Sequence, residues 1–195
     1  MVTTSGPATA SAPAPMLDSA PDEVLADRAA DGDPRAFAVL VRRYQRMLRG
    51  YAVRVLGGPT GADDAVQDAL VTAWQQLDDL QDPAAVRSWL IRITTRKALD
   101  VARGRKHHAD VDEIDVPAPD HAGPAGAADA MSLTEALSTA LDRLPETQRR
   151  AWTLREIGGY GYDEIATELD LPVSTVRGAL ARARARLITE LDGWR

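Results

Sequence analysis

The sequence predicts an all-α protein of two small helical domains joined by a flexible acidic linker, and three observations support this. Apolar residues recur at spacings of three and four along both halves of the chain, as in amphipathic helices, and no strand-like alternation is present. Between about residues 107 and 130 the chain is instead acidic and rich in Pro, Gly and Ala, which is typical of a linker. At 195 residues, the chain has room for two small domains.

The first domain is expected over residues 21–106, after an N-terminal tail. Residues 1–20 are rich in Ala, Pro, Ser and Thr, so we expect them to be disordered. Asp33-Pro34 is typical of a helix start, and Gly57-Gly58-Pro59 should end that helix. A second helix should begin near Asp63, and Asp82-Pro83 should start a third, giving a bundle of three amphipathic helices.

The second domain is expected over residues 131–193, after a linker over 107–130. Ser132-Leu-Thr-Glu135 is a capping box that predicts a new helix, and Pro145 should begin another. Residues 162–169, a short turn and an Arg-rich segment from Ser174 then predict a helix-turn-helix. Ser174 is a suitable N-cap for its second helix, and Asp170 can adopt the left-handed conformation that the turn requires.

Charge is segregated along the chain. The net charge is −6, but residues 87–106 hold seven basic residues against one acid, and residues 110–129 hold six acids with no Lys or Arg. The last helix adds Arg177, Arg182, Arg184 and Arg186 with no acid between them. Local fields of this kind attract phosphate whatever the net charge, so the basic blocks indicate nucleic-acid binding.

Several classes of protein are excluded by composition and motif. The absence of cysteine removes disulfides and thiolate metal sites. No apolar run approaches the roughly 20 residues of a membrane helix, and no secretion signal begins the chain, so we expect a cytoplasmic protein without membrane insertion. His107-His108 and nearby acids fall in the predicted linker, which cannot fix a metal, and no catalytic triplet is suggested. We therefore expect no enzyme activity, cofactor or metal.

Three segments, in order, carry a family resemblance. Asp63-Asp64-Ala-Val-Gln67-Asp68 through Trp74, then Ser88-Trp89-Leu90-Ile-Arg92-Ile93, then Leu144-Pro145 with the helix-turn-helix, resemble the extracytoplasmic-function class of bacterial sigma factors over residues 22–192. The resemblance implies sigma region 2 in the first domain and sigma region 4 in the second. It also implies core RNA polymerase as a partner, at its β′ clamp and β flap, together with promoter DNA and, in many members, an anti-sigma factor.

The resemblance assigns three sets of site residues. An acidic, partly apolar face suits the basic β′ clamp, and a cationic track suits the single strand of the −10 element. The start of the last helix would contact the −35 element, where Arg can bridge guanine O6 and N7. The core-binding set is Asp64, Gln67, Asp68 and Trp74; the −10 set is Arg92, Arg96, Lys97, Arg103 and Arg105; the −35 set is Ser174, Thr175, Arg177, Gly178, Ala181 and Arg182.

Simpler interpretations of the same residues remain open. The basic helices can be merely solvated, and Trp74 fits a core position as well as a contact. Trp89 lies beside Leu90 on an apolar face and is interpreted as core. The family often has Asn where this chain has Arg96, so Arg96 is assigned only a general DNA contact.

Two other functions are compatible with a helix-turn-helix. A stand-alone regulator would bind duplex DNA tightly without polymerase, but it leaves the first domain unexplained. An adaptor would occupy polymerase without contacting DNA, and would keep its activity when Arg177 and Arg182 are reversed in charge. Sigma function is the interpretation that uses both domains.

Overall fold

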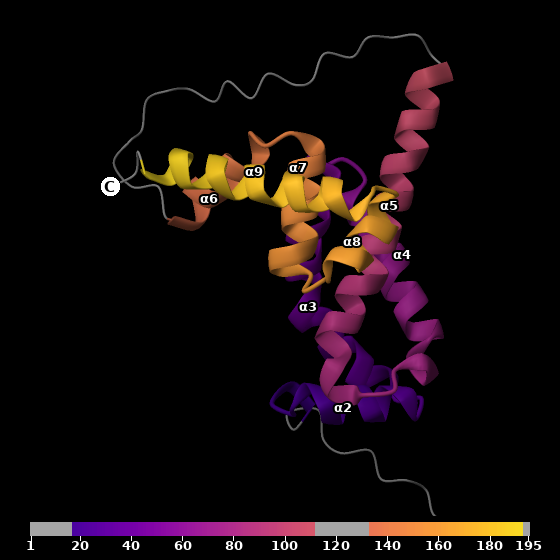
Figure 1. Ribbon diagram of the computed structural model, residues 1–195. Helices are drawn as coiled ribbons and strands as arrows, with labels where there is room; N and C mark the ends of the chain where they lie inside the picture. Colours follow the sequence, from indigo (N-terminus) through magenta and orange to yellow (C-terminus); the bar gives the residue numbers. More distant parts are fainter. Residues whose placement is uncertain (1–16, 112–132, 193–195) are drawn as a thin grey trace, which may run out of the picture.

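The computed structural model describes residues 17–111 and 133–192, and within these ranges every regular element is helical. Figure 1 shows an N-terminal unit of mainly upright helices, with a C-terminal unit lying across its upper part. The N-terminal unit consists of α2 (Asp22–Ala30), α3 (Pro34–Leu56), α4 (Ala62–Gln75), short 3-10 turns at Leu77–Asp79 and Pro83–Ala85, and α5 (Val86–Val111). The C-terminal unit consists of α6 (Leu133–Asp142), α7 (Glu146–Trp152), a π-helical turn at Thr153–Ile157, α8 (Tyr162–Leu169) and α9 (Val173–Asp192).

The helix ends of the N-terminal unit follow local sequence signals. The Asp33 carboxylate accepts a hydrogen bond of 3.0 Å from the Arg35 amide, which caps α3 ahead of Pro34. Gly57 ends α3 in the left-handed conformation, at φ 80°. Asp82 caps the chain before α5 in the same way, through the Ala84 amide. The three predicted helices of this unit are confirmed.

Two features at the start of the chain differ from prediction. Helix α2 was not foreseen, because its buried positions are Leu25 and two alanines, a weak periodic signal. Residues 17–20 were placed in a disordered tail, yet Leu17 is buried in the core and Asp18 forms an ion pair of 2.6 Å with Arg42. The prediction of disorder is therefore wrong for these four residues, and residues 1–16 lie outside the described ranges.

The predicted linker is partly helical. Helix α5 continues to Val111, so residues 107–111, which include His107-His108, extend it. The rest of the acidic segment lies outside the described ranges, as does Ser132 of the predicted capping box. Helix α6 begins at Leu133, where the capping box predicts a helix. Within the described ranges, no helix is both long and apolar enough to cross a membrane.

The helix-turn-helix is confirmed, with one correction. Asp170 ends α8 in the left-handed conformation, at φ 53°, as the turn requires. Helix α9 begins at Val173, and the Pro172 carbonyl accepts from the amides of Thr175 and Val176. Ser174 therefore lies inside the first turn and is not the N-cap. The sequence placed the N-cap two residues late, because serine is the better capping residue while proline can only contribute its carbonyl.

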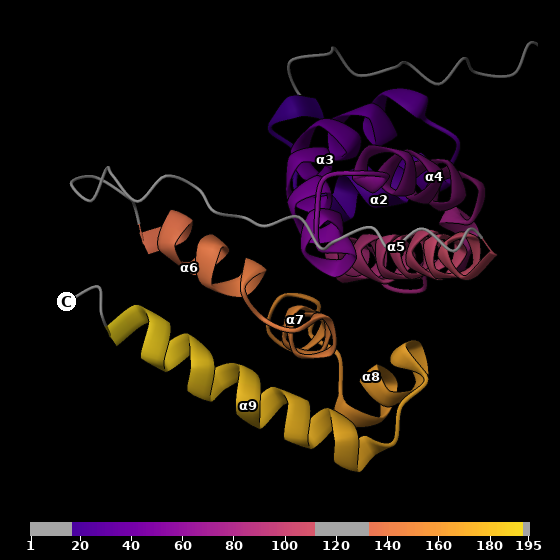
Figure 2. The same cartoon turned by 90° about the horizontal axis from the view of Figure 1, so that it is seen from above.

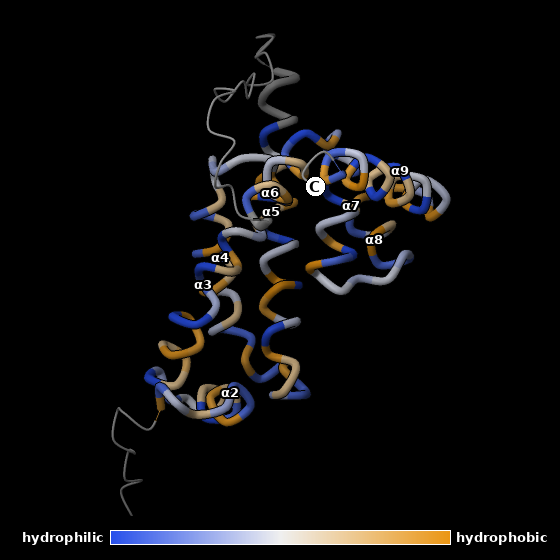
Figure 3. Tube along the Cα trace, turned by 90° about the vertical axis from the view of Figure 1, so that its left-hand side faces the viewer, coloured by the Kyte–Doolittle hydropathy of each residue, from blue (hydrophilic) through white to orange (hydrophobic). Residues whose placement is uncertain are grey.

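The two units share one hydrophobic core. In Figure 2 the C-terminal helices form a second layer beside the α2–α5 bundle, with α9 on the outside and α7 between α9 and the bundle. Tyr51 of α3 and Tyr160, which precedes α8, are buried in the same cluster, at 2% and 0% exposed. Trp152 packs against this cluster and against a smaller one between α6 and α9. Figure 3 shows the hydrophobic and hydrophilic positions interleaved along the helices.

Polar contacts and a close backbone approach add to the contact between the two units, which we call the junction. At the end of α3, the Arg54 carbonyl accepts a hydrogen bond of 3.0 Å from Nε of Arg149, and the Val55 carbonyl accepts one of 3.0 Å from Nε of Arg150. Both arginines belong to α7. These carbonyls have no partner inside α3, so the two guanidinium groups satisfy them. A Cβ at Gly158 would lie 2.7 Å from the Leu154 carbonyl oxygen and 2.9 Å from the hydroxyl of Tyr51, so glycine is needed where the units meet.

Candidate functional sites

An apolar groove of about 710 Å³ lies between α3 and α4. Trp74 and Val71 on its α4 side are 39% and 51% exposed, which is unusual for large apolar side chains. The Trp74 ring leans against Phe37 of α3, with centroids 5.1 Å apart and planes at 53°. Trp74 is thus packed on one side and exposed on the other, so the core interpretation holds in part and the contact with polymerase stays a prediction. The lining comprises Phe37, Val41, Gln45, Arg46 and Arg49 of α3, and Asp63, Val66, Gln67, Leu70, Val71 and Trp74 of α4.

The four residues predicted to bind core polymerase all lie exposed on α4. Gln67 and Trp74 line the groove, whereas Asp64 and Asp68 are exposed but are not part of its lining. Their positions, one residue along the helix from Asp63 and Gln67, place them on the adjoining face, so they would flank an apolar contact rather than enter it.

Sequence reasoning missed the α3 side of the groove. No role was predicted from the sequence for Phe37 or for Val71. The groove is formed by two helices whose exposed apolar residues coincide only after packing. An apolar residue on the polar side of an amphipathic helix, such as Val71, is the signal that could have found it.

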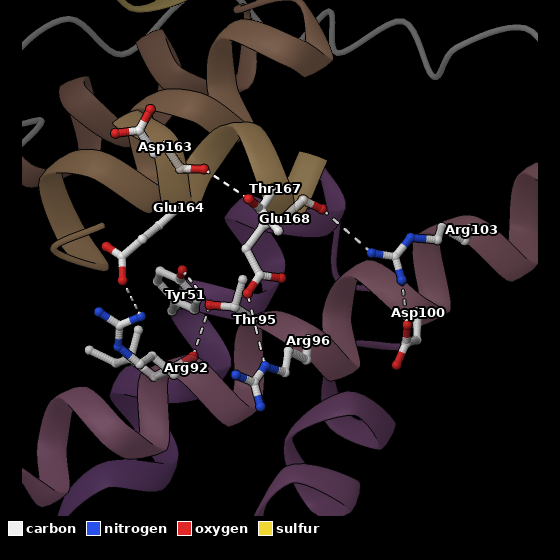
Figure 4. Close-up of polar contacts among 11 residues, drawn as sticks. Tyr51, Arg92, Thr95, Arg96, Asp100, Arg103, Asp163, Glu164, Thr167 and Glu168 are labelled. Atoms are coloured by element: carbon white, nitrogen blue, oxygen red, sulfur yellow. Dashed lines mark hydrogen bonds and ion pairs between the residues drawn. The ribbon is translucent and has the colours of Figure 1, made fainter. Parts of the chain in front are cut away.

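The basic face of α5 lies against α8 (Figure 4). Arg92 Nη1 is 2.7 Å from Glu164 Oε1, and its guanidinium carbon lies 4.8 Å from the centroid of the Tyr160 ring. Arg96 Nε is 3.9 Å from Glu168 Oε1, and Arg103 donates to the Glu168 carbonyl at 3.5 Å. Three of the five predicted −10 residues are therefore engaged by the first helix of the helix-turn-helix.

The carboxylate of Glu164 is held in place from two sides. Its Oε2 accepts from the Gly161 amide at 2.7 Å, the hydrogen bond of a helix N-cap, while Oε1 faces Arg92. The hydrogen bond from Arg92, followed by that from Gly161, holds the pKa of Glu164 below its usual value. The same contact raises the pKa of Arg92, so the pair is fully ionised near neutrality.

The remaining residues of the basic block occupy other environments. Arg105 donates to the Thr60 carbonyl in the loop between α3 and α4. Lys97 is half-buried on α5. Trp89 is partly buried and packs against the main core, as the sequence predicted.

The residues predicted to contact the −35 element share one face of α9. Their spacings of three and four place them together on its first turns, and all are exposed except Gly178, which is half-buried. A Cβ at Gly178 would lie 3.1 Å from Nη1 of Arg182, so the Arg182 side chain folds back over this position. This face holds Ser174, Thr175, Arg177, Gly178, Ala181 and Arg182.

The ring of Tyr162, at the start of α8, contacts two arginine side chains. The guanidinium carbons of Arg155 and Arg177 lie 4.9 and 5.7 Å from its centroid. Arg184, by contrast, pairs with Glu156 at 2.8 Å. A cation over an aromatic face is held in place without using its N–H groups as donors. Arg177 can therefore still donate from two N–H groups to O6 and N7 of a guanine. Sequence reasoning missed this role for Tyr162, because it arises only when α8 and α9 pack together.

No metal centre is formed within residues 17–111 and 133–192, since no three His, Asp or Glu side chains there are arranged to hold an ion. The described chain thus presents three surfaces: the apolar groove, the α5 face covered by α8, and the α9 face.

Comparison with known proteins agrees with this division. Residues 40–108 match the family model described as Sigma-70 region 2, and residues 134–187 match that described as Sigma-70, region 4. The ECF RNA polymerase sigma-E factor of Escherichia coli (strain K12) is 36% identical over 180 residues, covering 87% of this chain and 93% of that protein. The RNA polymerase sigma-H factor of Pseudomonas aeruginosa is 35% identical over 179 residues, with the same coverage of both chains.

Two solved structures are also similar. One is CnrH in complex with the cytosolic domain of CnrY, 34% identical, with a TM-score of 0.51 over 88% of this chain and 97% of that one. The other is the sigma factor RpoE of Bartonella quintana in complex with the anti-sigma factor NepR, with a TM-score of 0.58 over 82% of this chain and 98% of that one. At 24% identity, the second likeness is one of fold.

Proposed function

The chain belongs to the ECF group of RNA polymerase sigma factors, and on that premise we propose how its surfaces divide the work of transcription initiation. It binds core RNA polymerase and directs initiation at specific promoters by recognising −35 and −10 elements. The observation that carries this function is the presence of both sigma regions, in order, at 36% identity over 93% of the sigma-E factor. Sigma factors act as non-catalytic subunits, and the catalytic site is that of polymerase.

The groove between α3 and α4 is the surface we assign to core polymerase. Trp74 and Val71 offer apolar area that only a partner can cover, and an aromatic ring in a pocket is typical of an interface anchor. Asp64 and Asp68 flank it with negative charge, which would steer a basic helical partner.

The two DNA-binding assignments follow charge and exposure. Arg177 and Arg182 on the exposed face of α9 would reach base edges of the −35 element, with Ser174 and Thr175 on phosphates. The guanidinium groups of α5, led by Arg92, would follow the backbone of the single-stranded −10 element. A stand-alone regulator is not favoured, because it uses neither the groove nor α5.

We further propose that a protein inhibitor controls this chain. CnrH, which is similar over most of its length, was solved with the cytosolic domain of a second protein bound. Affinity purification of the chain from its host, followed by identification of a stoichiometric partner that blocks transcription in the assay below, would support this. Recovery of core polymerase subunits alone would contradict it.

Run-off transcription with purified core polymerase tests the function. The template is a pool of genomic promoter fragments from the host, with and without this protein. Discrete start sites that depend on the protein are expected. Charge reversal of Arg177 and Arg182 should abolish those transcripts while co-elution with core is retained. Co-elution without any start site would instead indicate an adaptor.

A further inference from the structure

The contact between α5 and α8 joins surfaces that are predicted to act separately on DNA. Arg92 and Arg96 come from the basic block of the first unit, and their partners Glu164 and Glu168 lie 72 residues further along the chain in each pair. Figure 4 shows both carboxylates directed toward the arginine side chains of α5, with Arg103 reaching the end of α8. We call Glu164 and Glu168 the acidic face of α8.

The chemistry of this contact resembles that of a nucleic-acid backbone. An ionised carboxylate offers a guanidinium group the same charged oxygen acceptors as a phosphate. Glu164 remains ionised because Arg92 and the Gly161 amide both bind its charged form. Its second hydrogen bond also fixes the orientation of the carboxylate, so Arg92 meets a preformed acceptor.

We propose that the acidic face of α8 is a docking surface for α5 in the free protein, where it competes with single-stranded DNA for Arg92, Arg96 and Arg103. The inference rests on the proposed function, because it takes these arginines as contacts of the −10 strand. The strand and α8 cannot occupy the same N–H donors at once. Strand binding therefore requires that the C-terminal unit moves away from α5.

The rest of the junction explains why α8 stays in place without DNA. Tyr160 is fully buried between the units, and Arg149 and Arg150 satisfy the terminal carbonyls of α3. The Arg92–Glu164 pair is 41% and 45% exposed, and in the longer Arg96–Glu168 pair the arginine is 67% exposed, so each pair contributes little to stability. Neutralising them should therefore free the arginines and slightly lower the cost of separating the units, without unfolding either unit.

The central experiment measures binding of a fluorescein-labelled, random-sequence 15-nucleotide DNA strand to the full-length free protein by anisotropy at low salt. The test variant carries Glu164→Gln and Glu168→Gln, since a glutamine oxygen can still accept from the Gly161 amide. Its matched control carries Asp163→Asn and Asp78→Asn, which remove the same charge from exposed positions outside the contact.

A second measurement follows the distance between the units. Because the chain has no cysteine, Val24→Cys and Ile188→Cys introduce labelling sites at exposed positions, one on each unit. Donor and acceptor dyes at these sites report separation as a loss of energy transfer. Circular dichroism verifies that the test and control variants remain equally helical.

The expected result is about five-fold tighter strand binding by the test variant, the scale of two weak ion pairs, with a loss of energy transfer when the strand is added. The control variant should change affinity by less than about two-fold. Equal affinity of the test variant and wild type, with both folded, would overturn the proposal.

A third arm separates this inference from the proposed function. Arg92→Gln, Arg96→Gln and Arg103→Gln added to the test variant should abolish its gain in strand affinity. If the gain persists, DNA binds elsewhere and the competition is refuted. Run-off transcription judges sigma function independently, since promoter-dependent transcripts from the wild type would stand even if α8 proved not to compete.

Discussion

Replacing Trp74 by alanine should weaken binding to core polymerase by a calculable amount. Trp74 is 39% exposed, and a tryptophan presents at most about 250 Å², so about 100 Å² remains for a partner to bury. At about 25 cal/mol per Å², covering that area contributes about 2.5 kcal/mol, which corresponds to about 60-fold in affinity. A partner that covers the ring incompletely would give a smaller loss.

The same substitution also affects the fold, so a gentler variant is needed beside it. About 150 Å² of the ring is already buried, partly against Phe37, and losing it would cost the fold about 4 kcal/mol. Val71→Thr keeps the shape of a side chain that is 51% exposed but buries a hydroxyl in the apolar contact, at a cost of about 1–2 kcal/mol in binding. Val24→Thr makes the same change on α2, outside the groove, at a residue that is 42% exposed.

Affinity for purified core polymerase can be measured by competition against the wild-type protein, with urea unfolding recorded for each variant. Val71→Thr should lose about ten-fold, Val24→Thr less than about two-fold, and both should unfold near the wild-type midpoint. If Val71→Thr and a folded Trp74→Ala each bind within two-fold of wild type, the groove is not the core-binding surface and the assignment of Trp74 is refuted.

Three further outcomes follow from single contacts. Gly158→Ala places a Cβ 2.9 Å from the hydroxyl of Tyr51 on α3, so urea unfolding should show that the free energy of unfolding falls by about 1–3 kcal/mol. Its control is Gly104→Ala, which has open space around the added Cβ and should be neutral or stabilising. Arg177→Ala removes every donor that could bridge a guanine edge, so run-off transcription should fall about ten-fold or more at promoters with guanine there, while co-elution with core persists. Burial, followed by the hydrogen bond to Asp22, raises the pKa of Tyr44 to about 12. The contribution of the Tyr44 hydroxyl to folding stability is therefore complete below the ordinary tyrosine pKa and is lost as pH rises through about 12. Tyr44→Phe should make the alkaline loss of stability shallower in denaturant titrations.

Local signals in the sequence were sufficient for most helices. Asp33 and Gly57 begin and end α3 because capping and left-handed geometry depend on neighbouring residues alone. Asp170 forms the predicted turn for the same reason. The exceptions are instructive: α2 presents only one large buried residue, Leu25, and the start of α9 is set by the carbonyl of Pro172, which carries no side-chain signal.

The candidate sites were predictable as residues but not as surfaces. The −35 face follows from helical spacing within one helix, and the structure places its members together. The α3–α4 groove and the α5–α8 contact each need two helices, and nothing local to Arg92 indicates that Glu164 will meet it. Opposite charges in separate blocks were visible in the sequence, but the acids that face α5 within the described residues come from α8, which the charge pattern did not emphasise.

The pairing of α5 with α8 also bears on how an acidic protein handles DNA. A cationic face left open would bind any nucleic acid, because non-specific affinity depends on the number of phosphates neutralised and not on sequence. Bacterial DNA offers an excess of such sites over any one promoter, so a free subunit with an exposed −10 surface would be titrated by the chromosome. Internal pairing of Arg92 and Arg96 removes two cations from that count. Arg177 lies over an aromatic ring and pairs with no acid in the described residues, so its N–H donors stay available. This pairing predicts a difference in the salt dependence of strand binding. The logarithm of affinity for random single strands should fall with the logarithm of salt concentration less steeply for the wild type than for the Glu164→Gln, Glu168→Gln variant. The two slopes should differ by about 1.4, the value for two additional phosphate contacts. Equal slopes would mean that α5 meets DNA to the same extent in both, and that the ion pairs leave its charge available.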